Sequence, residues 1–367
     1  MYISNINLKN FRNYSNQSIA LSPNINIFTG SNGMGKTSLL ESITLCSIGK
    51  SCRTPRDKEL IKWEKDTAKV EVIVQKTEGD EKVSISLSRV ENKRVQVNSL
   101  PLSKLGELMG VVSTVFFSPQ ELKVVQGAPS ERRAFIDIAL CQLSKTYFYL
   151  LARYNKILSQ RNKLLKSNKL TDDALDIWDT QLASEGAKVI KTRKGFITQL
   201  APFAIEHHAF LSSDKENITI EYEGLGGDTI EQIQIEFLQA LKKDKEKDLR
   251  LGYTHTGPHK DDISVKNSKM DLRIYGSQGQ QRTAALSLKL AQLFLATQKS
   301  FETPVLLLDD VLSELDLTRQ QKLLDRIKGF QTIITCTHLE PAIFETLKNN
   351  SIQFVVQDGE VNLINKN

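Results

Sequence analysis

The segment FTGSNGMGKTSLLESI, residues 28–43, decides the fold class of this chain. Its stretch from Gly30 to Thr37 matches the pattern G-x-x-x-x-G-K-[ST], after a short strand-like run and before a helical one. Glycines at this spacing let backbone N–H groups turn inward around a phosphate, and the following helix adds its positive end. The segment therefore predicts a phosphate-binding loop rather than a glycine turn that only opens a helix.

Two side chains of this loop have the chemistry to act on a nucleotide. Lys36 is expected to bridge β- and γ-phosphate oxygens, and the Thr37 hydroxyl is expected to ligate Mg²⁺. Such a loop does not by itself separate a kinase, a transporter motor and a GTPase, and no motif selects adenine over guanine. The residues predicted to bind the nucleotide here are Gly30, Ser31, Asn32, Gly33, Met34, Gly35, Lys36 and Thr37.

A second segment, PVLLLDDVLSELD at 304–316, places two carboxylates after an apolar strand. A strand this apolar is expected to be buried on both faces of a parallel sheet. Asp309, at its carboxyl end, is expected to hold Mg²⁺ through water, and Asp310 is placed to act as the general base toward an attacking water. Helix capping is the alternative for an isolated pair of aspartates, but the phosphate loop makes it the minor reading.

The third segment, YGSQGQQRTAALSLKLAQLFLA at 275–296, predicts a long helix from Arg282 to Ala296. Ser277 and Gly279 form a turn at its start, and a helix start of this kind can bind an anion. Because the loop at Gly30 to Thr37 already supplies one phosphate site, we expect the second to face a phosphate bound to another copy of the chain.

Residues 126–248 differ in composition and in apolar periodicity from the flanking segments. No glycine or proline occurs from Ser130 to Ser167, where apolar residues recur at helical spacing, and a second helix is expected over 172–211 with an interruption near Pro202. A third is expected over about 229–243, followed by KKDKEKDLR as an exposed connector. The sequence thus predicts a helical arm domain at 126–248 between two lobes of an α/β unit, 1–125 and 249–367.

This arm is rich in basic residues, while the whole chain has a net charge of only +6. Residues 153–169 contain six basic residues, the last two being Lys166 and Lys169, and no acid. Such clusters fit contact with phosphates of DNA, read by backbone and shape because no base-reading motif occurs; a solvated helix face is the alternative. The predicted DNA-binding residues are Arg153, Lys156, Arg161, Lys163, Lys188, Lys191, Arg193 and Lys194.

Other features exclude several classes of protein. No signal peptide and no apolar run of roughly 20 residues occurs, so no membrane association is expected. The four cysteines show no disulfide framework, which favours a reduced, cytoplasmic protein. His255 and His259 are four residues apart, but Gly257 and Pro258 between them favour a packed turn over a metal site.

Together these segments resemble the ATPase head of the ABC and SMC class, in which two heads enclose two ATP molecules. SQGQQR at 277–282, which includes Gln280, resembles the signature that closes over the partner's γ-phosphate, and SELD at 313–316 resembles the D-loop. His338 resembles the switch histidine of that class. The runs LKNFRNY (8–14), SCRTPRDKELI (51–61), FFSPQELKVVQGAPSERRAFID (116–137) and THTGPHKDDI (254–263) are similar to the RecF family of bacterial recombination mediators.

This resemblance implies an α/β phosphate-loop ATPase head with an inserted, mainly α-helical arm. It implies ATP and Mg²⁺ as cofactors, an ATP-dependent homodimer on double-stranded and gapped DNA, and partnership with RecR and RecO in loading RecA. It also implies nucleotide contact near Arg12 and a catalytic glutamine at Gln120, with Gln126 as the alternative. Arg53 and Arg56 are left open between phosphate, DNA and carboxylate partners.

Related ATPases usually have a glutamate where this chain has Asp310, so we expect slow hydrolysis. An architectural DNA-binding module that uses ATP only to join two copies, and a transporter motor subunit, are the alternative functions.

Overall fold

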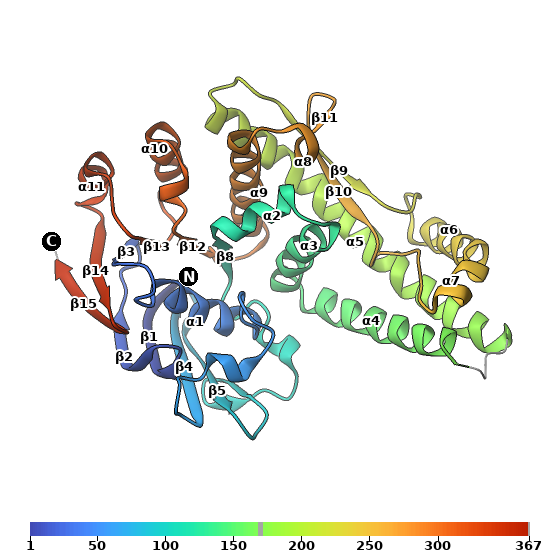
Figure 1. Ribbon diagram of the computed structural model, residues 1–367, viewed down its shortest axis with the longest axis horizontal. Coiled ribbons are helices and arrows are strands. Elements are labelled where there is room, and N and C mark those ends of the chain that lie inside the picture. Colours follow the sequence, from blue (N-terminus) through green and yellow to red (C-terminus); the bar gives the residue numbers. More distant parts are fainter. Residues whose placement is uncertain (168–171, 366–367) are drawn as a thin grey trace. The chain divides into compact units, whose positions relative to one another are not determined.

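The computed structural model describes residues 1–167 and 172–365, and it divides into two compact units (Figure 1). Unit 1 comprises Met1–Glu121, Phe210–Ser213 and Lys289–Asn367; unit 2 comprises Leu122–Ala209 and Asp214–Leu288. The three-part division at 125 and 248 stays a prediction. Among the described residues, no helix combines the length and the apolar character that a bilayer crossing requires. Lys169, part of the basic run, lies outside the described residues.

Unit 1 contains a six-stranded, mainly parallel sheet in which the strand order is β15-β14-β3-β13-β12-β8. Its apolar strand β12 has parallel neighbours on both sides and is buried along its whole length, as predicted. The strands are β3 (Ile25–Thr29), β8 (Thr114–Phe117), β12 (Val305–Asp309), β13 (Thr332–Cys336), β14 (Ser351–Gln357) and the antiparallel β15 (Glu360–Asn365). The helices in this part of the chain are α1 (Lys36–Ile48), α10 (Leu317–Arg326) and α11 (Pro341–Leu347).

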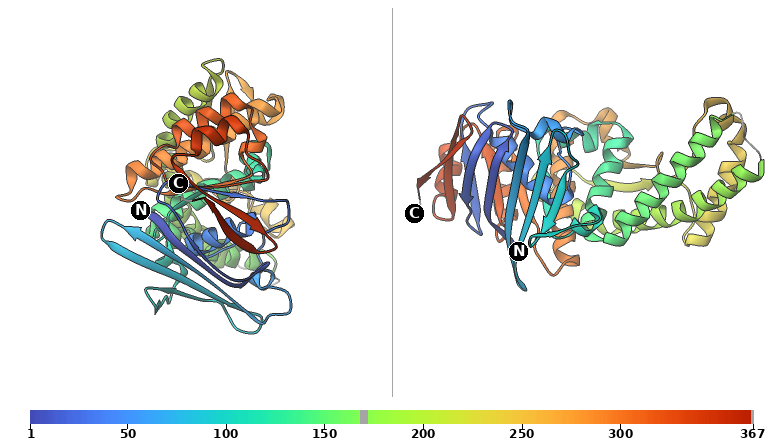
Figure 2. Two further views of the ribbon diagram at one scale, coloured as in Figure 1. Left: turned by 90° about the vertical axis from the view of Figure 1, so that its left-hand side faces the viewer. Right: turned by 90° about the horizontal axis from the view of Figure 1, so that it is seen from below.

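A second, antiparallel sheet of six strands completes unit 1, in blue to cyan in the right-hand view of Figure 2. The hairpin predicted over 68–88 is confirmed, because its two strands pair antiparallel from Thr67 with Ser88 to Lys76 with Gly79. The strand order is β2 (Tyr14–Ala20), β1 (Tyr2–Phe11), β4 (Thr67–Lys76), β5 (Gly79–Ser88), β6 (Arg94–Val97) and β7 (Leu100–Pro101). Helix α1 contacts strands of both sheets, which explains why nearly all its side chains are buried.

Unit 2 is mainly helical, with a small sheet ordered β11-β10-β9. Its strands are β9 (Ile218–Glu223), β10 (Asp262–Asn267) and β11 (Met270–Asp271). Its helices include α2 (Lys123–Gln126), α3 (Pro129–Leu143), α4 (Lys145–Leu165), α6 (Ile230–Lys243), α7 (Lys245–Leu251) and α8 (Leu272–Tyr275). Two further helices, α5 (Asp172–Ser212) and α9 (Gln278–Lys299), begin in unit 2 and end in unit 1.

The helical arm differs from the prediction in three places. The helical pattern from Ser130 to Ser167 forms two helices, α3 and α4, because Ser144 takes an extended conformation and its hydroxyl caps α4 by accepting the Tyr147 N–H. Helix α5 runs for 41 residues, about 60 Å at 1.5 Å per residue, and continues through Pro202. The segment 242–250 is largely exposed as expected, but it is not a simple connector, since Lys245–Leu251 form α7 and Asp248 is buried.

Candidate nucleotide site and arm surface

The phosphate loop lies between β3 and α1, and its glycines are required by the backbone. Gly30, Gly33 and Gly35 all have positive φ, at 154°, 83° and 119°. A Cβ on Gly30 would lie 2.3 Å from the Val356 carbonyl oxygen. No other residue type fits this position without moving β14, so the loop conformation follows from its sequence.

Residues from the β1–β2 turn support this loop, a role that no sequence pattern predicted for them. Asn13 Nδ2 donates a hydrogen bond to the Met34 carbonyl at 2.7 Å, and the Tyr14 hydroxyl donates to the Gly35 carbonyl at 2.9 Å. From the β14–β15 turn, the Gly359 N–H also donates to the Met34 carbonyl, at 3.2 Å. These residues belong to the run LKNFRNY, and only the tertiary structure shows what they hold.

Lys36 and Thr37 occupy the positions that their predicted roles require. The buried Lys36 ammonium donates to the carbonyls of Gly30 and Ser31 at 2.6 and 3.0 Å. The Thr37 hydroxyl donates to Asp309 Oδ1 at 3.0 Å, across 272 residues of sequence. One cation inside the loop, with a hydroxyl and a carboxylate at its edge, is a donor set that fits a triphosphate and Mg²⁺.

Asp309, at the end of β12, also accepts a hydrogen bond from the Thr335 hydroxyl at 2.7 Å. Burial raises the pKa of the Asp309 carboxyl above its ordinary value, and the hydrogen bonds from Thr335 and Thr37 oppose that rise. The neighbouring charge of Asp310 raises it further. A carboxylate in this setting gains much from a divalent cation, which compensates for its lost hydration.

Asp310 has a strained backbone, with φ of 54° in the left-handed region. Its N–H donates to the Thr335 carbonyl at 3.0 Å, which fixes the residue beside β13. The Asp310 Oδ1 atom is buried and has no hydrogen-bond partner among the described residues. Because a buried, unpartnered carboxylate oxygen is costly, this atom fits a role as an acceptor toward a bound water.

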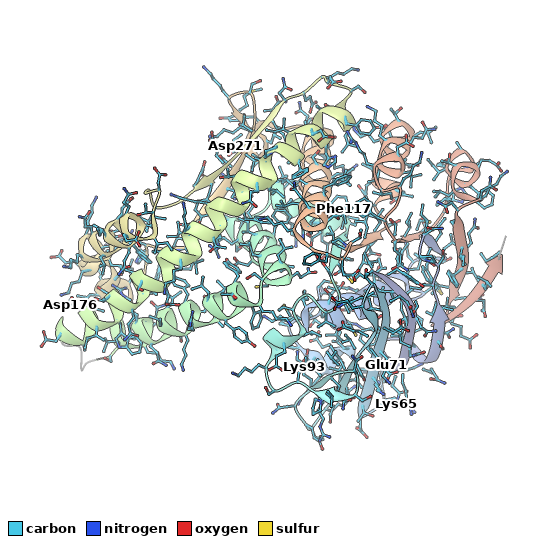
Figure 3. All side chains as sticks on the ribbon, turned by 180° about the vertical axis from the view of Figure 1, so that it is seen from behind. Lys65, Glu71, Lys93, Phe117, Asp176 and Asp271 are labelled. Carbon is cyan, nitrogen blue, oxygen red and sulfur yellow. The ribbon has the colours of Figure 1, made fainter. Side chains whose placement is uncertain are left out.

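Topology brings the predicted catalytic residues to this same edge of the sheet. Strands β3, β13, β12 and β8 run parallel, so the phosphate loop, His338, Asp310 and Gln120 all follow carboxyl ends of one sheet. Gln120 and His338 are exposed there, and Phe117, which ends β8, is labelled in Figure 3. The alternative glutamine, Gln126, instead donates to Gln281 Oε1 at 2.8 Å in unit 2.

Arg12 is engaged by protein groups. Its guanidinium donates to both carboxylate oxygens of Glu41, each at 2.8 Å, and to the Glu59 carbonyl at 2.9 Å. Three of its N–H groups are therefore used. The predicted nucleotide contact at Arg12 stays a proposal, and its described partners make it a brace of the β1–β2 turn.

The Ser277 turn belongs to unit 2 and forms a capped helix start. The Gln280 N–H donates to the Ser277 hydroxyl at 3.3 Å, and the Ser277 N–H donates to Gln280 Oε1 at 2.9 Å. Gln281 Nε2 donates to the Leu272 carbonyl at 2.7 Å and so ties α8 to α9. Ser277 is exposed at this tip, two residues before Gly279, and a helix start of this kind can bind an anion.

Two predicted DNA-binding arginines are buried. Arg161 is 0% exposed and donates to Asp179 at 2.5 Å and to Asp248 at 2.6 Å. Arg193 is 2% exposed and makes a bidentate pair with Asp137 at 2.9 and 2.8 Å. This corrects the prediction for these two side chains, because a buried guanidinium paired with carboxylates cannot reach a DNA phosphate.

The other basic residues of the arm reach solvent to different degrees. The side chains of Lys156 and Lys163 are exposed, and their ammonium groups make no hydrogen bond or ion pair among the described residues. Arg153 and Lys188 both contact Glu185, at 3.1 and 2.7 Å. Lys191 and Lys194 donate to main-chain carbonyls of the loop before α6.

The histidine pair of unit 2 is explained by packing. His255 Nδ1 is 2.8 Å from Asp248 Oδ1, and His259 Nδ1 is 2.6 Å from the Tyr154 hydroxyl. Burial lowers the pKa of His259 to about 4. Within the described part of the chain, no group of three or more histidine, cysteine, aspartate or glutamate side chains is arranged to hold a metal ion.

Comparison with known proteins places this geometry in a family. Residues 2–361 match the family model described as RecF/RecN/SMC N terminal domain. The DNA replication and repair protein RecF of Clostridium perfringens is 43% identical over 361 residues, which cover 98% of this chain and 99% of that protein. The corresponding protein of Clostridium novyi is 45% identical over 362 residues, 99% of this chain and 100% of that one.

Solved structures agree with this assignment. The recombination mediator protein RecF-ATP in the RecFOR pathway has a TM-score of 0.92 and 34% identity, over 99% of this chain and 98% of that one. An SMC head bound to the C-terminal winged-helix domain of ScpA, 16% identical with a TM-score of 0.58, shares the fold. The chain therefore belongs to the RecF family, within the wider group of RecF, RecN and SMC ATPase heads.

Proposed function

We propose that this chain is an ATP-dependent DNA-binding mediator of recombinational repair and replication, in which ATP joins two copies on duplex or gapped DNA. The joint placement of Lys36, Thr37 and Asp309 at one sheet edge carries the proposal. Its full-length relatives are named DNA replication and repair protein, and one relative of known structure is described with ATP. Both facts support the same activity.

In this proposal the nucleotide site is built from the loop at 30–37 and from β12. Lys36 and the loop N–H groups bind the triphosphate, while Thr37 and Asp309 hold Mg²⁺. Bound Mg-ATP supplies the negative charge that joins two copies and the phosphoanhydride bond that is cleaved. Asp310 accepts a proton from water at its unpartnered Oδ1. Its side chain is one methylene shorter than glutamate, so we expect turnover to be slow.

The Ser277 tip is the second element of the proposal. Ser277, Gly279 and Gln280 contact the γ-phosphate held by the other copy, through a helix start at which Ser277 is exposed. Gln120 and His338 complete the catalytic site from the sheet edge. ATP then acts as the bridge between two chains, and its hydrolysis separates them.

The exposed cations of the arm are the proposed DNA contacts. We expect Lys156 and Lys163 to contribute most to DNA binding, since no described side chain or carbonyl pairs with their ammonium groups. A smaller contribution is expected from four further cations, because each already contacts a carboxylate or a carbonyl: Arg153, Lys188, Lys191 and Lys194. We further propose that the chain works with RecR and RecO in loading RecA, by analogy with the relative that is assigned to the RecFOR pathway.

A filter-binding titration of the wild-type chain with duplex DNA, with and without Mg-ATP, tests the proposal. Six phosphate contacts would make log Kd change with log salt concentration at a slope of about 5. ATP is expected to tighten binding. DNA affinity that does not change with ATP or salt would contradict the proposal, and the absence of DNA affinity would favour a transporter motor.

The variant Asp310→Asn separates a hydrolysing mediator from an architectural module that uses ATP only to join two copies. We expect turnover to stop and ATP-dependent DNA complexes to persist longer. If repair activity in cells survives the loss of turnover, the module is the better description.

A further inference from the structure

Three exposed apolar side chains of unit 2 lie shortly before the Ser277 turn, and together they form what we call the apolar surface. Met270 on β11 is 57% exposed, and Ile274 and Tyr275 on α8 are 61% and 69% exposed. The last two are the most exposed large apolar side chains among the described residues of unit 2. Single exposed apolar residues are ordinary, whereas three within six residues indicate an interaction surface.

Hydrogen bonds hold α8 in a fixed position relative to the start of α9 (Figure 1). Gln281 Nε2 donates to the Leu272 carbonyl at 2.7 Å, and the Gly276 N–H donates to the same carbonyl at 3.1 Å. A Cβ on Gly276 would lie 2.5 Å from this carbonyl oxygen, so the link between the two helices has no room for a larger residue. Tyr275 is therefore presented at a set distance from Ser277 rather than on a free loop.

The charges beside the apolar surface cancel, which bears on what can cover it. Asp271 Oδ2 and Arg273 Nη2, on either side of the buried Leu272, lie 3.6 Å apart. Residues 270–280 contain no other charged side chain and so have no net charge. A DNA backbone is bound through uncompensated cations. A protein surface is therefore a better occupant than DNA.

The Ser277 tip indicates which protein surface this is. In the proposed function the tip contacts the γ-phosphate that a second copy holds in its own phosphate loop. Tyr275 is two residues before Ser277, and two residues span at most about 7 Å, so a copy that reaches Ser277 also reaches Tyr275. A stable interface buries about 800 Å² per partner around apolar and aromatic side chains. The tip residues Ser277, Gly279 and Gln280 supply no such side chain, whereas the apolar surface does.

We propose that the apolar surface packs against a second copy of the chain, beside the nucleotide which that copy holds. The inference rests on the proposed function and deepens it. ATP decides whether two copies join, because the Ser277 tip needs a phosphate to contact. The apolar surface sets how tightly they join, because removing its area from water favours association. In a two-fold dimer each of the two nucleotides has one such surface beside it.

Sedimentation velocity of the full chain with Mg-ATP, over a range of protein concentrations, tests the proposal. Tyr275→Ala should raise the dimer dissociation constant by about tenfold or more, and Ile274→Ala by about threefold, because each removes apolar contact area. Tyr275→Phe should stay within about threefold of wild type, because it keeps the ring. The Mg-ATP affinity of the monomer should be unchanged in all three variants. A wild-type dissociation constant for Tyr275→Ala would overturn the proposal.

A matched control separates this surface from exposed apolar residues in general. Ile235 on α6 is also 57% exposed and belongs to the same unit, so Ile235→Ala should leave the dimer dissociation constant unchanged. A rise equal to that of Tyr275→Ala would refute the assignment of the surface.

The unfolding temperature of each variant should match wild type, because the substituted side chains are exposed. If Tyr275→Ala fails to fold, Ile274→Ala decides alone, and an unchanged dissociation constant for it would overturn the proposal. Wild-type protein that stays monomeric with Mg-ATP would instead refute the proposed function.

Discussion

The phosphate loop and the basic helix α4 differ in what their sequences specify. In the loop, glycine spacing dictates a backbone, and the backbone dictates that Lys36 is buried among carbonyls. In α4, the sequence specifies a helix with many cations but not the direction in which each one points. Arg161 faces Asp179 and Asp248 inside unit 2, while Lys163, two residues later, faces solvent. A motif with a required backbone thus predicts side-chain roles that a charge run cannot.

The largest expected effect is on stability, and it tests the difference between Arg161 and Lys163 within α4. Arg161→Ala leaves two buried carboxylates without their cation and should cost about 3–5 kcal/mol of unfolding free energy. Chemical denaturation followed by circular dichroism measures it. Lys163→Ala is the matched control and should stay within about 0.5 kcal/mol of wild type. Similar stability of the two variants would mean that the buried ion pairs of Arg161 do not stabilise unit 2.

A second prediction tests the loop side of the comparison. Lys36→Met removes the ammonium that the loop carbonyls surround and should weaken ATP binding by about 100-fold, the loss expected for charge-assisted bonds to phosphate. Titration of a fluorescent ATP analogue measures the affinity. The fold should persist, so an unfolded variant would shift Lys36 from a ligand to a structural role.

Much of the nucleotide site could be predicted from the sequence, because its signals lie within short segments. The segments around Gly30, around Asp309 and around Ser277 each combine a strand or helix pattern with residues of defined chemistry. Ser144, which ends one helix and caps the next, had a sequence signal that helical periodicity concealed. Asn13, Thr335 and Glu41 had none, because their roles arise from contacts between segments far apart in the chain.

The arm was predictable only as a set of helices. Arg161 and its partners lie 18 and 87 residues apart in the sequence, so burial of the pair depends on how α4, α5 and α7 pack. Charge alone cannot reveal that packing. A long, glycine-free basic run therefore predicts a helix more securely than it predicts a DNA surface.

A third prediction concerns acid sensitivity of unit 2. Burial lowers the pKa of His259 to about 4, below its ordinary value of 6.5, so the unfolded chain binds the extra proton first. Stability should therefore fall as pH drops from about 6.5 to about 4, by up to about 1.4 kcal/mol per pH unit. Urea unfolding at pH 7, 6 and 5 measures the slope.

His259→Gln should lower that slope by the contribution of one proton, about 1.4 kcal/mol per pH unit at most. Val265→Ala, which destabilises the same unit without removing a titrating group, should keep it. Equal slopes in wild type and His259→Gln would show that another group governs the acid sensitivity.

The smallest expected effect sharpens the description of the arm surface. Lys156→Ala should lower the salt slope of DNA binding by about 1, because one phosphate contact is lost without a change in fold. Filter binding at several salt concentrations measures the slope. Lys328→Ala, an exposed lysine of unit 1 paired with Asp325, should leave the slope unchanged. A loss of the same size at Lys328 would show that the arm is not the preferred surface.

Sedimentation velocity with and without Mg-ATP tests the central claim most directly: a triphosphate bound to one copy is capped by the Ser277 tip of another. Wild type should shift toward dimer with ATP, and Lys36→Met should stay monomeric. Ser277→Arg should bind ATP with wild-type affinity yet also stay monomeric, because the added side chain blocks the helix start. An ATP-dependent dimer of Ser277→Arg equal to that of wild type would contradict the account.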